Sequence, residues 1–351
     1  MKKAPEKTRI KDIALLSGLS EGTVDRVLHN RGNVSVSSQK KVEDALAQMD
    51  YKPNVYASAL AQKKKIHLIC IIPKYNPGDY WERVASGINK AHEEMSMLNV
   101  YINTIYFDQY DLFSCRKAFE TTLSLSPDGV LFPPFFKEES VAFTAKLNDS
   151  GIPFVFLDSY IADTNVLAYY GQDSFRSGAI AAKLLMSIVD SNAKIALFQT
   201  YRNGNLGSNQ TKERKNGFLD YLNAHHPTCK TFTIGLNATE HNKNLEILKQ
   251  HLSDNPETKG VVIFNSLSYI VTKYLKEIGR QDIKVIGYDI LQRNKECLLR
   301  DEIHYLIAQR PDEQGYLGVK ALCENLLFNR ETSKINYMPI DIIVKENIEY
   351  C

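Results

Sequence analysis

From Ile66 almost to the end of the chain, short apolar runs of strand length alternate with segments whose apolar residues recur at helical spacing. This alternation predicts an α/β fold with doubly wound parallel sheets. The 351 residues exceed the length of one typical domain, so we expect a small helical domain ahead of the α/β part. The predicted strands are Ile66–Ile72, Val100–Tyr106, Gly129–Phe132, Pro153–Leu157, Lys194–Gln199, Lys230–Gly235, Gly260–Phe264, Lys284–Gly287 and Tyr305–Ile307, with a last strand-like run at Ile340–Val344.

The segment Ile10–Leu28 contains two short helical patterns that are separated at Gly18. Glycine permits the positive φ of a tight turn, and Val24 can fill a core shared by the two helices. Ser20 is a predicted N-cap of the second helix, and Ser35 is a predicted N-cap of a third. This is the spacing of a DNA-binding helix-turn-helix, whose second helix enters the major groove.

Positive charge is concentrated in the same part of the chain. Residues 1–65 hold 13 Lys and Arg against 7 Asp and Glu, a net charge of +6. The remainder holds 30 against 34, a net charge of −4, although the whole chain is only +2. A basic end of this kind favours nucleic acid as its partner.

The six cysteines are scattered without a C-x-x-C pair, which predicts reduced thiols and no zinc site. The basic N-terminus is not followed by the apolar region of a secretory signal, and the longest apolar runs are far shorter than a membrane span. We therefore expect a cytoplasmic, nucleoid-associated protein with no membrane partner.

Residues 9–61 resemble, without a gap, the headpiece of the lactose-repressor (LacI/GalR) family. The shared motifs are Asp12-Ile13-Ala14, Thr23-Val24, Arg26-Val27-Leu28 and the hinge pattern Tyr51-x-Pro53-Asn54-x-x-Ala57-x-x-Leu60-Ala61. The resemblance implies a homodimer on operator double-stranded DNA, with paired hinge helices and Leu60 wedged between base steps in the minor groove. An ordinary core leucine remains the alternative for Leu60.

Base readout is expected from Glu21 and Arg26, because Glu can accept from cytosine and Arg can bind guanine through two hydrogen bonds. Glu21 is equally well explained as a carboxylate that the helix dipole favours. Gly22 stands where the family usually has a larger base-reading side chain. The DNA-binding candidates are Lys11, Ser20, Glu21, Gly22, Thr23, Arg26, His29, Asn33, Asn54, Ala57 and Leu60.

The rest of the chain resembles a type I periplasmic binding protein, the sugar-binding fold that this regulator family carries. The matching motifs are Tyr80-Trp81, Pro127-Asp128-Gly129-Val130, Arg214-x-x-Gly217-Phe218, Gly287-Tyr288-Asp289 and Gln309-Arg310-Pro311. The resemblance implies two lobes with a ligand between them and crossovers near residues 171, 310 and 338. The expected domains are a headpiece (1–50), a hinge helix and linker (51–65) and a ligand-binding domain (66–351), with one lobe at 66–170 and 310–337 and the other at 172–308 and 339–351.

Ligands of parallel sheets bind beyond the carboxyl ends of the strands, and several polar residues stand just past predicted strands. Tyr80 and Trp81, the only tryptophan, could cover the apolar face of a sugar ring. The ligand-binding candidates are Asn76, Tyr80, Trp81, Asp158, Asp173, Arg214, Asn265, Asp289 and Gln309. Asp173 and Asn265 are also explained as helix caps, and Arg214 as the partner of a helix carboxylate. Ser159 follows Asp158 where family members often have Arg.

We therefore expect a transcriptional repressor whose operator affinity is controlled allosterically by a small ligand, a sugar or sugar derivative. The alternatives are a regulator that senses a non-sugar metabolite such as a purine, and a transport binding protein. The sequence has no dinucleotide fingerprint, phosphate loop, nucleophile elbow or metal-ligand spacing, so we expect neither catalysis nor a cofactor.

Overall fold

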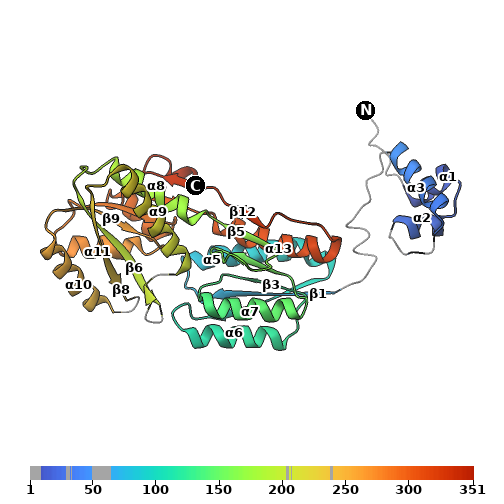
Figure 1. Cartoon of the computed structure of the whole chain (residues 1–351), viewed down its shortest axis with the longest axis horizontal. Helices are drawn as coiled ribbons and strands as arrows, with labels where there is room; N and C mark the ends of the chain where they lie inside the picture. Colours follow the sequence, from blue (N-terminus) through green and yellow to red (C-terminus); the bar gives the residue numbers. More distant parts are fainter. Residues whose placement is uncertain are drawn as a thin grey trace. The chain divides into compact units, whose positions relative to one another are not determined.

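The computed structural model describes residues 9–28, 32, 34–49, 65–202, 205–206, 208–237 and 240–351. The chain forms two compact units, an N-terminal unit (Met1–Gln62) and a C-terminal unit (Lys63–Cys351), which Figure 1 shows in colours that follow the sequence. Each unit has its own hydrophobic core.

The N-terminal unit is a three-helix bundle of α1 (Ile10–Ser17), α2 (Glu21–Leu28) and α3 (Val36–Gln48). Gly18 ends α1 in the left-handed conformation at φ 67°, which allows the tight turn into α2. Ser35 caps α3 by accepting a hydrogen bond from the backbone N–H of Ser38. The core consists of Ile13, Ala14, Val24, Val42 and Ala45. The helix-turn-helix prediction is therefore confirmed.

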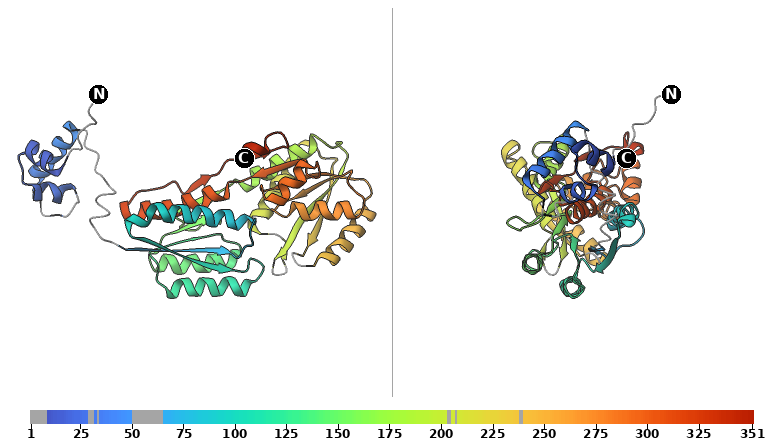
Figure 2. Two further views of the ribbon diagram at one scale, coloured as in Figure 1. Left: turned by 180° about the vertical axis from the view of Figure 1, so that it is seen from behind. Right: turned by 90° about the vertical axis from the view of Figure 1, so that its right-hand side faces the viewer.

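The first lobe of the C-terminal unit is built on a six-stranded parallel sheet with the order β12-β5-β4-β3-β1-β2. Its strands are β1 (Ile66–Pro73), β2 (Val100–Phe107), β3 (Gly129–Phe132), β4 (Phe154–Leu157), β5 (Ala168–Gly171) and β12 (Ile335–Tyr337). Its helices are α5 (Tyr80–Met95), η1 (Ser96–Leu98), α6 (Leu112–Ser124), α7 (Lys137–Asp149) and α13 (Pro311–Phe328). Both views show α6 and α7 on one face of this sheet and α5 and α13 on the other (Figures 1 and 2).

The second lobe has a sheet with the order β13-β11-β10-β9-β6, and β8 pairs with the far edge of β6. Its strands are β6 (Lys194–Arg202), β7 (Asn205–Leu206), β8 (Lys230–Leu236), β9 (Thr258–Ile263), β10 (Lys284–Tyr288), β11 (Tyr305–Ala308) and β13 (Asp341–Ile343). Its helices are α8 (Ser174–Met186), α9 (Asn209–His225), α10 (His241–Asp254), α11 (Ser268–Glu277), α12 (Gln292–Leu299) and η2 (Ile348–Tyr350). One core forms under α8 and α9, and another under α10, α11 and α12.

Every predicted strand is present, which confirms the α/β class. Strands β5, β7 and β12 were not predicted, and β13 pairs antiparallel with β11, so the second sheet is not purely parallel. The chain passes between the lobes three times: from β5 to α8, from β11 to α13 and from β12 to β13. Within the described part of the chain, no helix has the length and apolar character needed to span a membrane.

Glycines set the close approach of helices α8 and α9 in the C-terminal unit. A Cβ atom on Gly178 of α8 would lie 1.8 Å from the carbonyl oxygen of Arg214, and one on Gly217 of α9 would lie 1.8 Å from that of Phe175. Because both separations are far below van der Waals contact, α8 and α9 can pack at this distance only without side chains there. This contact fixes the position of α9 and of the arginine it carries.

Candidate functional site

The N-terminal unit presents the first turns of α2 to solvent. The hydroxyl oxygen of Ser20 accepts a hydrogen bond from the backbone N–H of Thr23 at 3.2 Å, so the predicted N-cap is confirmed. The exposed DNA-binding candidates are Lys11, Ser20, Glu21, Gly22 and Arg26, and Thr23 is half-buried. The other candidates, His29, Asn33, Asn54, Ala57 and Leu60, lie outside the described residues.

A cavity of about 380 Å³ lies between the two lobes of the C-terminal unit. Its first-lobe wall comes from the segments that follow β1, β2, β3 and β4, and its second-lobe wall comes from α9 and the segments that follow β9 and β10. The ligand candidates that line it are Asn76, Tyr80, Trp81, Asp158, Arg214, Asn265, Asp289 and Gln309. We call this cavity the interlobe cleft.

Two buried aspartates face the cleft from different lobes. Asp158 follows β4 and Asp289 follows β10, and both have left-handed backbones, with φ 63° and 69°. The Nε2 of Gln210 donates to Asp158 Oδ1 at 2.7 Å and to Gln309 Oε1 at 3.2 Å. The Nε2 of Gln309 donates to Asp289 Oδ1 at 2.9 Å. A continuous set of hydrogen bonds thus joins the two carboxylates across the cleft.

Arg214 lies beneath these groups with no exposed surface. Its Nη1 donates to the carbonyl oxygen of Phe264 at 2.8 Å, and its Nη2 donates to Gln309 Oε1 at 3.1 Å. The guanidinium carbon is 4.0 Å from the centre of the Tyr288 ring, a cation–π contact. The predicted alternative, an ion pair with a helix carboxylate, is therefore not what holds Arg214.

Burial raises the pKa values of two side chains in the cleft, Asp289 and Tyr80. Desolvation raises the pKa of Asp289 to about 6, against the opposing effects of Arg214 and the hydrogen bond from Gln309. Desolvation also raises the pKa of Tyr80 well above its usual range, and the nearby carboxylates of Asp158 and Asp289 add to this effect. The cleft therefore keeps Tyr80 as a neutral phenol, while Asp289 loses its proton near pH 6.

Aromatic rings cover one wall of the cleft. Tyr80 and Trp81 are the first residues of α5, and their ring centres are 5.1 Å apart in an edge-to-face arrangement. Trp81 makes a second edge-to-face contact, at 5.5 Å, with Phe135. An apolar wall opposite carboxylate and amide groups suits a ligand that has both an apolar face and hydroxyl groups.

Three candidates also have local structural roles. Asp173 is absent from the cleft lining, and it caps α8 by accepting a hydrogen bond from the backbone N–H of Arg176 at 2.9 Å. The alternative interpretation of Asp173 as an N-cap is confirmed, whereas its assignment as a ligand contact stays a prediction. Asn265 lines the cleft and also donates to the hydroxyl of Thr200 at 2.8 Å. Asn76 lines the cleft and donates to Asp79 at the start of α5.

The sequence analysis missed two glutamines near the aspartates. Gln210 stands four residues before Arg214, so both lie on one face of α9, and this helical spacing could have pointed to it. Gln314 of α13 accepts from the backbone N–H of Asp158 at 3.1 Å and donates to the carbonyl oxygen of Gln309 at 2.7 Å. Its position depends on how α13 packs, for which the sequence offers no local signal.

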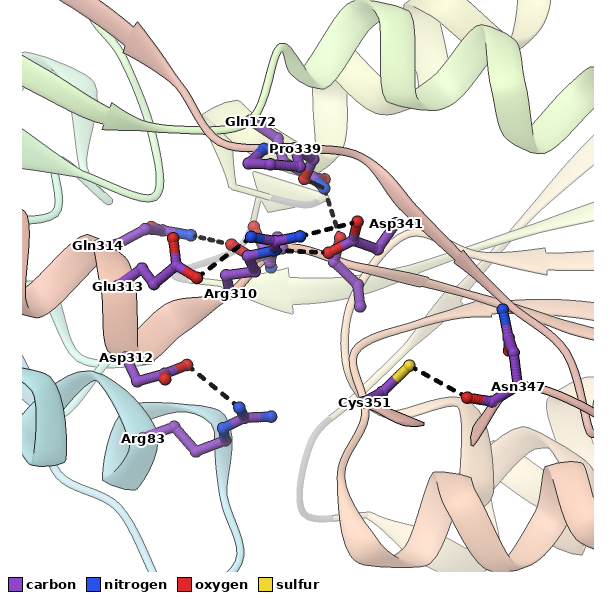
Figure 3. A network of polar contacts seen from close by, with 12 residues as sticks. Arg83, Gln172, Arg310, Asp312, Glu313, Gln314, Pro339, Asp341, Asn347 and Cys351 are labelled. Carbon is purple, nitrogen blue, oxygen red and sulfur yellow. Dashed lines mark hydrogen bonds and ion pairs between the residues drawn. The ribbon is translucent and has the colours of Figure 1, made fainter. Parts of the chain in front are cut away.

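Gln172 joins the three crossovers between the lobes. Its Nε2 donates to the carbonyl oxygen of Ala308 at 2.6 Å and to that of Pro339 at 2.9 Å. Gln172 itself lies between β5 and α8, whereas Ala308 ends β11 and Pro339 lies between β12 and β13. Figure 3 shows this side chain beside Pro339. One buried amide therefore couples all three connections about which the lobes can move.

Ion pairs surround the same crossovers (Figure 3). Arg310, with φ 50°, donates from Nε to Asp341 at 2.7 Å and pairs with Glu313 at 3.2 Å. Arg83 of α5 pairs with Asp312 of α13 at 3.1 Å. Because these side chains are partly exposed, each ion pair contributes little to the stability of the fold. Each pair also leaves an arginine near the cleft bound to a carboxylate of the protein.

Each of the two units matches a family of known proteins. Residues 9–54 match the model of bacterial regulatory proteins of the lacI family, and residues 69–329 match that of a periplasmic binding protein domain. A structure described as a LacI transcriptional regulator from Bacteroides fragilis is 38% identical, with a TM-score of 0.78, over 82% of this chain and 100% of that one.

Curated relatives extend over both units. The sucrose operon repressor of Pediococcus pentosaceus is 23% identical over 92% of each chain. The ribose operon repressor of Lactococcus lactis is 24% identical over 97% of this chain and 98% of its own length. This chain therefore belongs to the lacI family of bacterial regulatory proteins and carries a periplasmic-binding-protein domain behind its helix-turn-helix.

Proposed function

We propose that the protein is a repressor that binds operator DNA as a homodimer and changes its operator affinity when a sugar or sugar derivative enters the interlobe cleft. The observation that carries the proposal is the set of hydrogen bonds from Asp158 through Gln210 and Gln309 to Asp289. A ligand that replaced or bridged these bonds would favour one arrangement of the lobes over another. The names of the sucrose and ribose operon repressors support a sugar as the ligand.

Linkage connects this binding to DNA. A ligand shifts the equilibrium between two lobe arrangements only by the difference in its affinity for them, which is typically about 1–3 kcal/mol. The three crossovers, tied by Gln172, are the connections that change when the lobes move. Operator affinity then changes by the same free energy if the two arrangements present the DNA-reading units differently.

A homodimer follows from the geometry of DNA recognition. One short helix such as α2 reads only half an operator, and two copies related by a two-fold axis read both halves. Binding to chromosomal DNA requires a place in the cytoplasm. Since the relatives are repressors and not enzymes, we expect the bound sugar to be released unchanged.

The test begins with selection of binding sites from random double-stranded DNA by the full-length protein. We expect two related half-sites, and we expect Arg26→Ala to lower the affinity for the selected site. Arg176→Ala is the matched control, because it removes an exposed arginine from the C-terminal unit. Binding curves with a panel of sugars should then show a change of about 5–150-fold for one of them. The proposal would be contradicted if the selection yielded no preferred DNA sequence, or if the protein converted a sugar into a product.

A further inference from the structure

The charged groups of the interlobe cleft are predominantly acidic. Among the described residues that line it, the acidic ones are Asp79, Asp108, Asp158 and Asp289 and the basic ones are Lys74 and Arg214, a formal net charge of −2. Asp158 and Asp289 are the most deeply placed, with exposed fractions of 4% and 5%. A buried carboxylate repels an anion more strongly than an exposed one does, because solvent screens it less.

The buried cation of the cleft is already engaged by the protein. Arg214 gives one guanidinium nitrogen to Phe264 and another to Gln309, and its ring contact with Tyr288 covers the guanidinium plane. Arg214 lines the cleft but is fully buried, and these contacts engage both terminal nitrogens and one face of its guanidinium. An anion that bound both terminal nitrogens of Arg214 would have to compete with these contacts, and the α8–α9 packing holds Arg214 in place.

The other basic side chains near the cleft are also poor partners for an anionic ligand. Arg83 is paired with Asp312, and Arg310 is paired with Asp341 and Glu313. Lys74 lines the cleft but is exposed, so water and salt screen its charge. A bound carboxylate or phosphate would therefore meet two buried carboxylates and only one buried cation, Arg214, whose terminal nitrogens are already hydrogen-bonded to the protein.

Asp289 is well placed to accept hydrogen bonds from a ligand. Its Oδ1 accepts from Gln309, and its Oδ2 makes no hydrogen bond to another described residue although Asp289 lines the cleft. An ionised carboxylate oxygen can only accept, which suits a hydroxyl group. We propose that the cleft selects a carbohydrate without negative charge and rejects sugar acids and phosphorylated sugars. The inference rests on the proposed function, because it takes the cleft as the effector site.

Trp81 provides the measurement. It is the only tryptophan of the chain and it lies in the cleft wall, so its fluorescence reports binding in the cleft. The full-length protein is titrated with neutral sugars and their matched anions: galactose with galacturonate, glucose with glucose 6-phosphate and ribose with ribose 5-phosphate. For the pair whose neutral member binds, we expect the anion to bind at least about a hundredfold more weakly. This is the effect of one charge facing a like charge at ~6 Å with an effective dielectric constant of ~20.

Asp289→Asn removes one of the two buried charges, so the difference in affinity between the paired sugars should narrow by about tenfold or more. An anion that changes Trp81 fluorescence at the same or lower concentration than its neutral partner would overturn the charge assignment and leave the sugar-responsive regulator standing. If no sugar in the panel changed Trp81 fluorescence or operator binding, the proposed function would fail, and this inference with it.

Discussion

The side-chain amide of Gln172 donates to the carbonyl oxygen of Ala308 across 2.6 Å and thereby links the first crossover between the lobes to the second. The same nitrogen reaches Pro339 in the third. A single buried residue outside the cleft lining thus holds together the segments that must move when the cleft opens or closes.

Gln172→Met should weaken the coupling between effector and operator binding. Methionine has a similar size but no donor, so both carbonyl groups lose a hydrogen bond, and the C-terminal unit should lose about 1–3 kcal/mol of stability. The fold-change in operator affinity that an effector produces should be smaller than in the wild type. Gln250→Met, on the exposed face of α10, is the control and should behave as the wild type. Full coupling in the Gln172 variant would mean that this amide has no part in the switch.

Asp289→Asn should stabilise the C-terminal unit at neutral pH and not at acidic pH. Burial raises the pKa of Asp289 to about 6 from a reference value of 3.8, so the folded state holds this proton more tightly than the unfolded state. The contribution of this group to the free energy of unfolding is therefore fully present below about pH 4. It is lost as the pH rises through 6, which lowers the free energy of unfolding by up to about 3 kcal/mol.

The charges that act on Asp289 are Arg214 and Arg83, which oppose the shift, and Asp158, which adds to it. Urea unfolding followed by Trp81 fluorescence between pH 4.5 and 7.5 measures the effect. The free-energy difference between Asp289→Asn and the wild type should grow over this range. If the difference in the free energy of unfolding between the two proteins stayed constant over this pH range, ionisation of Asp289 would not destabilise the fold.

Gly178→Ala should destabilise the C-terminal unit and impair the cleft together. The added Cβ would lie 1.8 Å from the carbonyl oxygen of Arg214, so α9 has to move. Overpacking of this kind costs about 1–3 kcal/mol, and displacement of α9 also shifts Arg214 and Gln210. Thermal unfolding and sugar titration check both effects. Lys183→Ala, at an exposed position of the same helix, should change stability by less than about 0.5 kcal/mol.

Leu60→Ala should lower operator affinity much more than affinity for random DNA, because a wedge in the minor groove acts only where the duplex is bent to receive it. This prediction comes from the sequence, since Leu60 lies outside the described residues. Both affinities should also fall steeply with salt, as the net charge of +6 over residues 1–65 implies. Equal losses on operator and random DNA would refute the wedge.

The parts of the fold that the sequence predicted are those with strong local signals. The long apolar run of β1 and the glycine turn at Gly18 belong to this class. Strand β12 has only three residues at the sheet edge, and two of them, Ile335 and Tyr337, are exposed, so its pattern resembles a loop. The antiparallel direction of β13 depends on the third crossover, which no local pattern encodes.

The cleft residues also divide into those with a local sequence signal, which could be predicted, and those without one. Asp158, Asp289 and Gln309 could be predicted because each directly follows a strand, and strand ends of parallel sheets converge. Asp173 also follows a strand, but its side chain turns back to cap α8. Gln314 approaches from a helix whose rotation is set by packing, so only the structure brings it to Asp158.

The most direct test of the account compares operator binding, with and without the effector sugar, in the wild type, Asp289→Ala and Asp173→Ala. Loss of the Asp289 carboxylate should weaken sugar binding by about 1.5–3 kcal/mol, roughly 10–150-fold, because hydrogen bonds to a charged acceptor are lost. At a sugar concentration that saturates only the wild-type cleft, Asp289→Ala should bind operator as tightly as the sugar-free wild type and show no response. Asp173→Ala, which removes a carboxylate outside the cleft lining, should respond like the wild type. A full response in Asp289→Ala would contradict the assignment of the interlobe cleft as the site that controls DNA binding.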